Sequence, residues 1–189
     1  MSDHTPNELL RKSLHIAFGL FAFTLRWLPW WAAAGVAAAA ILGNWLVLHR
    51  VFGRGVSRDV RGFDFGIIAY PTVVFALIVM FRDQLHIAGI AWGMLAFGDG
   101  IATLAGKAMP LRPLPWNPSK SWGGFLGFLI VGSATGISLG YWLGYERPGV
   151  IVLAAFCAAV AESLAINLDD NLTVPAAAAV ALVLASFEP

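Results

Sequence analysis

The sequence predicts an all-α integral membrane protein, a bundle of about seven transmembrane helices formed by one domain, residues 1–189. Of its residues 59% are hydrophobic and only 12% are charged, and the aromatic residues include eight Trp and 13 Phe. A soluble domain carries about 25% charged residues because it needs a polar exterior, whereas Trp favours membrane–water interfaces. The net charge of +1 provides no bulk attraction to nucleic acid, so no nucleic-acid partner is expected.

Seven apolar segments approach the length of about 17–25 residues that a membrane-spanning helix needs. The first contains Arg11, Lys12 and Arg26, and the last is short, so these two are expected to tilt or to lie partly at the interface. No long polar linker separates the segments, which indicates one compact domain in the lipid bilayer. The segments run over Leu9–Leu28, Trp30–Leu48, Phe65–Phe81, Leu85–Gly106, Ser121–Leu143, Gly149–Asn167 and Leu172–Phe187.

The basic residues orient the bundle, because cytoplasmic loops are enriched in Lys and Arg. With the N-terminus inside, nine of the 12 basic residues lie on the cytoplasmic side, and Arg26, Arg82 and Arg147 lie outside. We therefore expect a multi-pass protein of the cell (inner) membrane with a cytoplasmic N-terminus. The N-terminal stretch and the loops near residues 50–63, 107–120 and 168–171 then meet at the cytoplasmic face.

Four groups of polar residues lie at or near this face, and the first is at the N-terminus. Glu8 precedes Arg11 and Lys12 at spacings of three and four residues, which places them side by side on a helix. A basic collar that anchors the helix at the membrane surface explains Arg11 and Lys12. It does not explain His15, which lies deeper along the same stripe.

The second group surrounds Asp99, which falls inside an apolar segment. A carboxylate at the centre of a membrane helix costs about 2.5–3.5 kcal/mol, so such residues usually face a bundle interior or an aqueous cavity. Gly98 and Gly100 leave room for a close approach by a ligand or a backbone. Lys107 continues the Asp99 face eight residues later. A bond from Asp99 to a neighbouring helix is the structural alternative.

The third group is the loop of residues 109–124, which four prolines stiffen. Ser119 or Ser121 is expected to cap the next helix. The first turn of that helix then presents backbone N–H groups to an anion, with Lys120 adding a mobile positive charge. Phosphate is the ligand that fits, and anionic lipid headgroups are the alternative.

The fourth group combines Glu162 with Asp169, Asp170 and Asn171. Carboxylate and amide oxygens suit Mg²⁺, which commonly bridges carboxylates to the phosphates of a substrate. A polar turn accounts for the last three residues but not for Glu162, which lies inside an apolar segment. Together the four groups supply the components of phosphoryl transfer, where catalysis is mostly positioning and charge stabilisation. The apolar bundle beside them provides a route for a lipid acceptor.

Four motifs resemble the phytol kinase and dolichol (polyprenol) kinase family and cover nearly the whole chain. They are Glu8–His15 (ELLRKSLH), Gly98–Gly106 (GDGIATLAG), Asn117–Gly124 (NPSKSWGG), and Glu162–Ser163 followed by Asp169–Pro175 (DDNLTVP). One departure is Lys107–Pro110, where relatives usually carry a further glycine. The resemblance implies transfer of the γ-phosphate of CTP to a membrane-embedded long-chain isoprenoid alcohol, such as phytol or a polyprenol, with Mg²⁺ as cofactor.

The resemblance also implies roles for individual residues in a single transmembrane catalytic domain. Asp99 is expected to accept the hydroxyl proton, with His15 as a weaker candidate and Lys120 acting on the phosphates. The expected nucleotide-binding residues are Arg11, Lys12, Lys107, Asn117, Lys120 and Ser121. The expected metal ligands are Asp99, Glu162, Asp169, Asp170 and Asn171.

Two other functions fit parts of the sequence. The wider superfamily contains CTP:phosphatidate cytidylyltransferases, which form CDP-diacylglycerol and release pyrophosphate, whereas the kinase releases CDP. A cation- or proton-coupled transporter would use Asp99 and Glu162 as sites near the middle of the bilayer. The two halves of the sequence show no inverted repeat, which disfavours the transporter.

Overall fold

The computed structural model describes residues 8–48, 65–109, 111–164 and 168–186, and most of them are helical. Three of the helical segments in the described part of the chain change type along their length. The first passes from an α-helix into a 3-10 helix, the second ends in a π-helical section, and the fourth contains a π-helical section. The elements are α1 (Glu8–Gly19), η1 (Leu20–Arg26), α2 (Trp30–Gly43), η2 (Asn44–Leu48), α5 (Phe65–Met80), α6 (Leu85–Gly93), η3 (Met94–Asp99), α7 (Gly100–Ala108), β1 (Pro113–Leu114), β2 (Asn117–Ser121), α8 (Trp122–Trp142), α9 (Pro148–Ser163) and α10 (Asp170–Ser186).

The helical class is confirmed, and each predicted apolar segment corresponds to one helical stretch of the described residues. Two helices, Leu85–Ala108 and Trp122–Trp142, are long and apolar enough to cross a membrane. Four shorter apolar helices accompany them, over Trp30–Leu46, Ile68–Met80, Pro148–Ser163 and Asp170–Ser186. Seven complete membrane spans therefore remain a prediction. The short antiparallel hairpin of β1 and β2 was not predicted.

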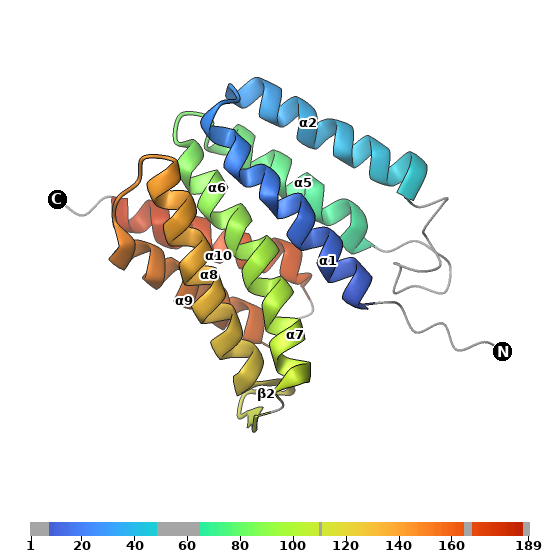
Figure 1. Cartoon of the computed structure of the whole chain (residues 1–189), viewed down its shortest axis with the longest axis vertical. Coiled ribbons are helices and arrows are strands. Elements are labelled where there is room, and N and C mark those ends of the chain that lie inside the picture. The colour runs from blue at the N-terminus through green and yellow to red at the C-terminus, as the bar shows by residue number, and fades with distance from the viewer. Residues whose placement is uncertain (1–7, 49–64, 110, 165–167, 187–189) are drawn as a thin grey trace.

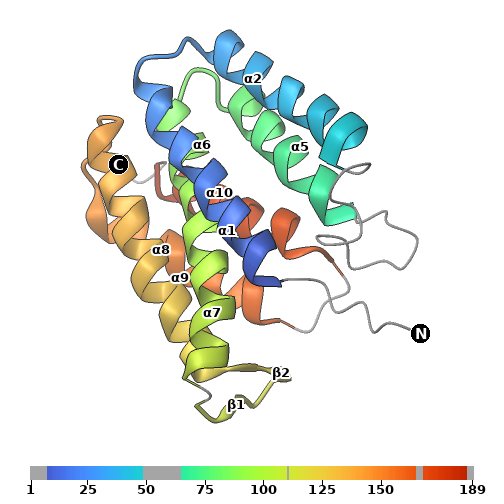
Figure 2. The same cartoon turned by 45° about the vertical axis from the view of Figure 1, so that its right-hand side comes forward.

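The continuous helix α6–η3–α7 lies at the centre of the molecule and contacts helices on several sides. α8 packs along its whole length, α10 contacts α6 and η3, and α1 contacts η3 and α7. α2 pairs with α5 on one side of this helix, and α8 pairs with α9 on the other (Figure 1). The β1–β2 hairpin lies beyond the adjoining ends of α7 and α8 (Figure 2). Every residue of Ile87–Gly93 is buried, as expected for a central helix.

Small residues allow the close packing that brings α1 onto the centre. A Cβ atom added at Gly19 would lie 2.3 Å from the Cβ of Ala96, so a larger residue would push α1 away from η3. Helices inside membranes usually pack closely through small residues. The hydrophobic effect does not drive their association there, because the lipid tails are as apolar as the side chains. This contact places the polar residues of α1 beside Asp99, the last residue of η3.

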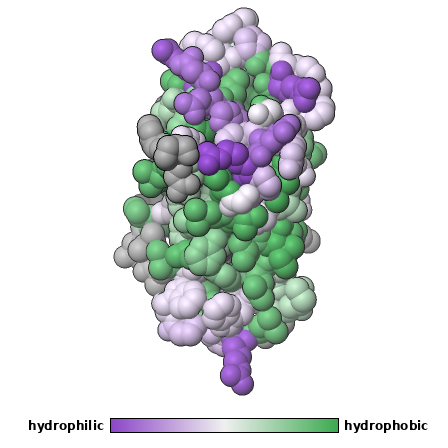
Figure 3. All heavy atoms as spheres, turned by 90° about the vertical axis from the view of Figure 1, so that its left-hand side faces the viewer, coloured by the Kyte–Doolittle hydropathy of each residue, from purple (hydrophilic) through white to green (hydrophobic). Residues whose placement is uncertain are grey.

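Large apolar side chains are exposed along the sides of the bundle. Examples are Leu20, Trp31 and Leu42 near the N-terminus, and Ile130 and Leu184 nearer the C-terminus. Hydrophobic residues cover the middle of the face in Figure 3, and hydrophilic residues gather at its two ends. Monomeric soluble proteins rarely expose contiguous apolar surface on this scale. The surface therefore fits contact with lipid.

Candidate functional site

Five charged side chains from five different elements meet at one place in the structure. Lys12 comes from α1, Asp99 from the end of η3, Lys120 from β2, Glu162 from α9 and Asp170 from the start of α10. We call this group the charged cluster. The predicted convergence of four separate polar groups at one face agrees with this arrangement.

Asp99 and Lys12 form the deepest ion pair of the cluster. The Lys12 Nζ atom donates to Asp99 Oδ2 at 2.5 Å, and both side chains are nearly inaccessible to solvent. Asp99 ends a π-helical section, a local widening that is frequently found at functional sites. Its second oxygen, Oδ1, is buried and has no hydrogen-bond partner among the described residues. A buried carboxylate oxygen that accepts no hydrogen bond is costly, so it marks a position suited to a ligand.

Lys120 bridges the other two carboxylates. Its Nζ atom lies 2.5 Å from Glu162 Oε1 and 3.2 Å from Asp170 Oδ2. Burial lowers the pKa of the Lys120 ammonium, but the Glu162 and Asp170 carboxylates raise it by more, so the pKa lies above its usual value. Lys120 is therefore positively charged at neutral pH and available to contact an anion.

The three carboxylates of the cluster are close enough together to share one metal ion. One oxygen from each of Asp99, Glu162 and Asp170 lies within 4.8 Å of the others. Hard cations such as Mg²⁺ prefer oxygen ligands, which these three carboxylates supply. The five groups of the cluster carry a net charge of −1 when all are ionised, so one divalent cation would leave them positive. The donor set thus fits Mg²⁺ and, with it, a phosphate-bearing ligand.

The hairpin holds Lys120 in place through contacts to the end of α9. The Asn117 amide donates to the Ser163 carbonyl at 3.1 Å, and Asn117 Oδ1 accepts from the backbone N–H and hydroxyl of Ser119. The Trp116 indole donates to Ser163 Oγ at 3.0 Å. Asn117 was predicted to bind the nucleotide, but these contacts already use its amide. They indicate that it positions the loop that carries Lys120.

Ser121 caps α8, which confirms one of the two predicted capping residues, Ser119 and Ser121. Its Oγ accepts from the Gly124 N–H at 3.2 Å. The Trp122 N–H donates to the Arg112 carbonyl at 3.1 Å. Two N–H groups of the first turn therefore already have partners within the protein, which weakens the prediction that this turn binds an anion.

The remaining predicted site residues take other positions. Lys107 is exposed on α7, and Asn171 is buried in the first turn of α10. Asp169 precedes α10, and its Oδ1 accepts from the Asn171 N–H at 2.9 Å, so it acts as a cap for that helix. It is not one of the three carboxylates that converge. The Arg11 side chain lies outside the part of the chain that the structure describes.

His15 is buried one turn after Lys12, where it contacts a tyrosine that sequence analysis did not single out. The His15 ring stacks on Tyr70 with ring centroids 4.2 Å apart. The Tyr70 hydroxyl donates to the His15 carbonyl at 3.2 Å and accepts from the Trp92 indole at 2.8 Å. A tyrosine within an apolar segment was the only sequence signal for this contact, and apolar helices often contain one without a special role.

Comparison with known proteins identifies related plant kinases over most of the chain. Phytol kinase 1 (chloroplastic) of Arabidopsis thaliana is 32% identical over 203 residues, covering 94% of this chain and 66% of the relative. Probable phytol kinase 2 (chloroplastic) of Oryza sativa subsp. japonica is 29% identical, covering 89% and 63%. Farnesol kinase (chloroplastic) of Arabidopsis thaliana is 28% identical, covering 92% and 64%.

These coverages mean that the chain spans slightly less than two thirds of the length of each of these three relatives. No protein-family model matches the chain, and no solved structure matches it.

Proposed function

Because the chain belongs to the phytol and polyprenol kinase family, we propose that it is a lipid-alcohol kinase that transfers the γ-phosphate of CTP to a long-chain isoprenoid alcohol. The observation that carries the proposal is the charged cluster, in which three carboxylates that fit a cation lie beside two lysines that fit phosphate oxygens. The relatives named above are phytol and farnesol kinases, which supports an isoprenoid acceptor. The choice of CTP rests on the family resemblance of the motifs.

The residues of the charged cluster have different roles in the proposed phosphoryl transfer. Asp99, Glu162 and Asp170 would hold Mg²⁺, which neutralises charge on the phosphates of the donor. Lys120 is fixed by its two carboxylate partners and by the hairpin, so its ammonium group contacts phosphate oxygens from a defined position. Lys12 contributes a second positive charge from α1.

Asp99 is the group best placed to receive the proton of the acceptor. Its Oδ1 is buried and without a hydrogen-bond partner in the described part of the chain, while Oδ2 is held by Lys12. In the proposed reaction the alcohol oxygen forms a bond to the γ-phosphorus and its proton passes to Asp99 Oδ1. The bond from the γ-phosphorus to the bridging oxygen breaks, and CDP leaves with that electron pair. A positioned base of this kind contributes about 10²–10⁴-fold to a rate.

We place the reaction at the cytoplasmic face of the cell membrane. The apolar flanks of the bundle and its two long apolar helices support a membrane location. The cluster is assembled from the N-terminal helix, the hairpin and the α9–α10 junction, which the distribution of basic residues assigns to the cytoplasmic side.

The test is turnover by the purified protein in lipid vesicles with Mg²⁺ and γ-labelled CTP. The panel of acceptors contains phytol, farnesol, geranylgeraniol, polyprenols, diacylglycerol and phosphatidic acid. We expect label in an isoprenoid monophosphate, release of CDP, and at least a 100-fold fall in turnover for Asp99→Asn. Pyrophosphate release with phosphatidic acid, without label transfer to any alcohol, would instead identify a cytidylyltransferase.

A further inference from the structure

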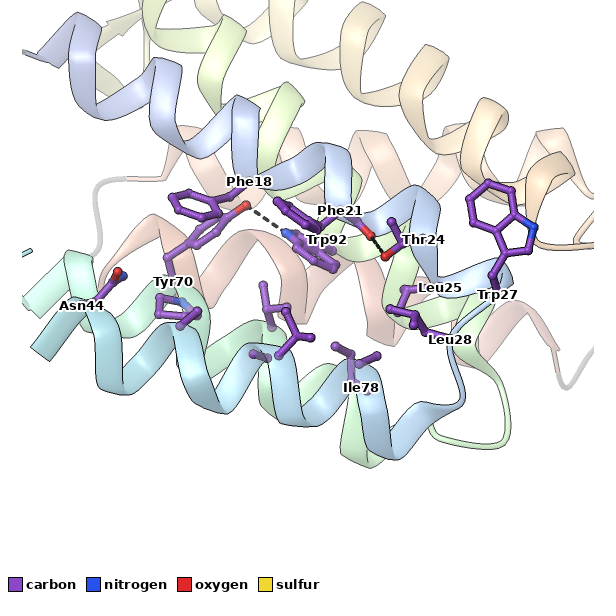
Figure 4. A pocket seen from close by; sticks show the side chains of 16 residues that line it. Phe18, Phe21, Thr24, Leu25, Trp27, Leu28, Asn44, Tyr70, Ile78 and Trp92 are labelled. Carbon is purple, nitrogen blue, oxygen red and sulfur yellow. Dashed lines mark hydrogen bonds between the residues drawn. The ribbon is translucent and has the colours of Figure 1, made fainter. Parts of the chain in front are cut away.

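A long apolar groove lies between the N-terminal helix and the α2–α5 pair, apart from the charged cluster. Its volume is about 430 Å³, within the range of about 300–1,000 Å³ that is usual for small-ligand sites. Its walls come from α1 and η1 on one side and from α2 and α5 on the other. Figure 4 labels Phe18 and Leu25 on the first side, and Tyr70 and Ile78 of α5 on the second. None of the motifs singled out in the sequence supplies these walls, since the family motif at the start of α1 ends at His15, before Phe18.

The lining of the groove suits a hydrocarbon. It consists mostly of aliphatic and aromatic side chains, among them Phe18, Leu25, Val74 and Ile78. Two polar groups in it already have partners: the Thr24 hydroxyl donates to the Phe21 carbonyl, and the Trp92 indole donates to Tyr70. Phosphates or a nucleotide base would lose their hydrogen bonds to water in such a lining without replacement. The groove is therefore unsuited to the phosphate donor.

One end of the groove lies close to the charged cluster along α1. Tyr70, Phe18 and Asn44 line this end, and Trp27, Leu28 and Ile78 line the other (Figure 4). Tyr70 contacts His15, which is one turn from Lys12 and hence from the Lys12–Asp99 pair. A helix advances about 1.5 Å per residue, so Phe18 lies about 9 Å along α1 from Lys12. A molecule in the groove thus has one end less than two helical turns from Lys12, the ion-pair partner of Asp99.

The groove also opens to the outside of the bundle and has a limited length. Phe18, Phe21 and Val36 line it and are each at least 40% exposed, so a lipid in the bilayer has access from the side. Along α2 and the first residue of η2 the lining extends from Ala33 to Asn44, about 16 Å at about 1.5 Å per residue. That length suits a farnesyl or phytyl chain, whereas a long polyprenol would extend beyond the far end.

We infer that this groove holds the hydrocarbon chain of the acceptor alcohol, with the hydroxyl at the Tyr70 end and the chain tail at the Trp27–Leu28 end. The inference rests on the proposed kinase function for the identity of the occupant, and it adds the place and direction of binding. It makes α2 and α5, which carry none of the charged cluster, the part of the fold that selects chain length.

Three alanines of α2 allow a matched test of this geometry. Ala33 lines the groove at its far end, Ala40 lines it nearer Tyr70, and Ala39 is exposed on the same helix and does not line it. Each is replaced by Phe in the full chain, and kcat/KM is measured with geraniol, farnesol and geranylgeraniol. Unfolding temperatures in detergent micelles verify that the variants are folded.

The expected pattern depends on position. Ala33→Phe lowers kcat/KM for geranylgeraniol at least tenfold relative to geraniol, because only the longer chain reaches the far end. Ala40→Phe lowers kcat/KM for all three alcohols at least tenfold, and Ala39→Phe changes none by more than twofold. Unchanged kcat/KM values for all three alcohols in both lining variants, with an active wild-type protein, would overturn the inference and leave the kinase function standing.

Crosslinking gives a measurement that does not depend on turnover. A farnesol analogue with a diazirine at the tail end is irradiated with the wild-type protein in vesicles, and the labelled peptides are identified by mass spectrometry. We expect label on Trp27–Leu28 and the first half of α2, competed by unlabelled farnesol but not by excess phospholipid. Label confined to other helices, or competed equally by phospholipid, would refute the groove as the acceptor site. Groove labelling without transfer to any alcohol would support the site and refute the kinase function.

Discussion

Removal of Lys12 tests whether the buried ion pair with Asp99 organises the site. The two charged atoms are 2.5 Å apart and their side chains are 4% and 3% exposed. At an effective dielectric constant of about 20, their attraction is about 7 kcal/mol, which the cost of removing both ions from water largely offsets. Replacing Lys12 by Met removes the attraction but leaves the Asp99 carboxylate buried. Breaking a buried pair in this way costs about 3–5 kcal/mol.

The assay is thermal unfolding of the purified protein in detergent micelles, followed by tryptophan fluorescence. For a chain of this size, about 3–5 kcal/mol corresponds to a fall in Tm of about 6–20 °C. The double variant Lys12→Met/Asp99→Asn should recover much of this loss, since no unpaired charge stays buried. The control is Asp83→Asn, which breaks an exposed pair with Arg82 whose side chains are 87% and 58% exposed. Exposed pairs contribute about 0–1 kcal/mol.

The reasoning would be refuted if Lys12→Met and Asp83→Asn lowered Tm equally. It would also be refuted if the double variant were less stable than Lys12→Met, because the two losses would then be independent. A recovery in the double variant identifies coupling between the two side chains, as a double-mutant cycle is designed to do.

Four further outcomes are expected. Glu162→Gln should raise the Mg²⁺ concentration needed for half-maximal turnover and reduce the rise in Tm that Mg²⁺ produces; an unchanged Mg²⁺ response would exclude this carboxylate as a ligand. Gly123→Ala should destabilise the protein by about 1–3 kcal/mol in thermal unfolding, since the new Cβ would lie 2.2 Å from the Met109 carbonyl oxygen. Gly35→Ala, where no atom lies within 4 Å, should be neutral or stabilising by up to about 1 kcal/mol. In a Cys157→Ala background, a cysteine replacing exposed Asp83 should react with an impermeant maleimide from outside intact cells, and reaction only after lysis would contradict the proposed orientation.

The helical segments were predictable because hydrophobicity is a local property of the sequence. Each segment expected from apolar length matches one helical stretch of the described residues, with ends that differ by a few residues. The β1–β2 hairpin was not predictable in the same way, because its four nearby prolines indicate only a stiff loop. Its shape depends on contacts from Trp116 and Asn117 to Ser163, which is more than 40 residues away in sequence.

For the ion pairs, the sequence likewise revealed the individual charged residues but not their distant partners. Sequence spacing placed Lys12 beside Glu8, whose side chain lies outside the described part of the chain, and gave no sign that Lys12 pairs with Asp99, 87 residues away. Acids within apolar segments could be recognised individually, because a carboxylate buried in a membrane helix is energetically costly and requires a compensating partner. The identity of each partner depends on how the helices pack, which the contact between Gly19 and Ala96 decides for α1.

The adjacent acids Asp169 and Asp170 at the start of α10 could not be told apart from the sequence. Both were expected to bind the metal ion. In the structure Asp169 caps the helix through the Asn171 N–H, while Asp170, one position later, turns toward Lys120 and joins the carboxylates of Asp99 and Glu162. The helical register that follows from the cap therefore decides which acid enters the cluster. Loss of Asp170 should accordingly affect Mg²⁺ dependence, whereas loss of Asp169 should act mainly through the stability of α10.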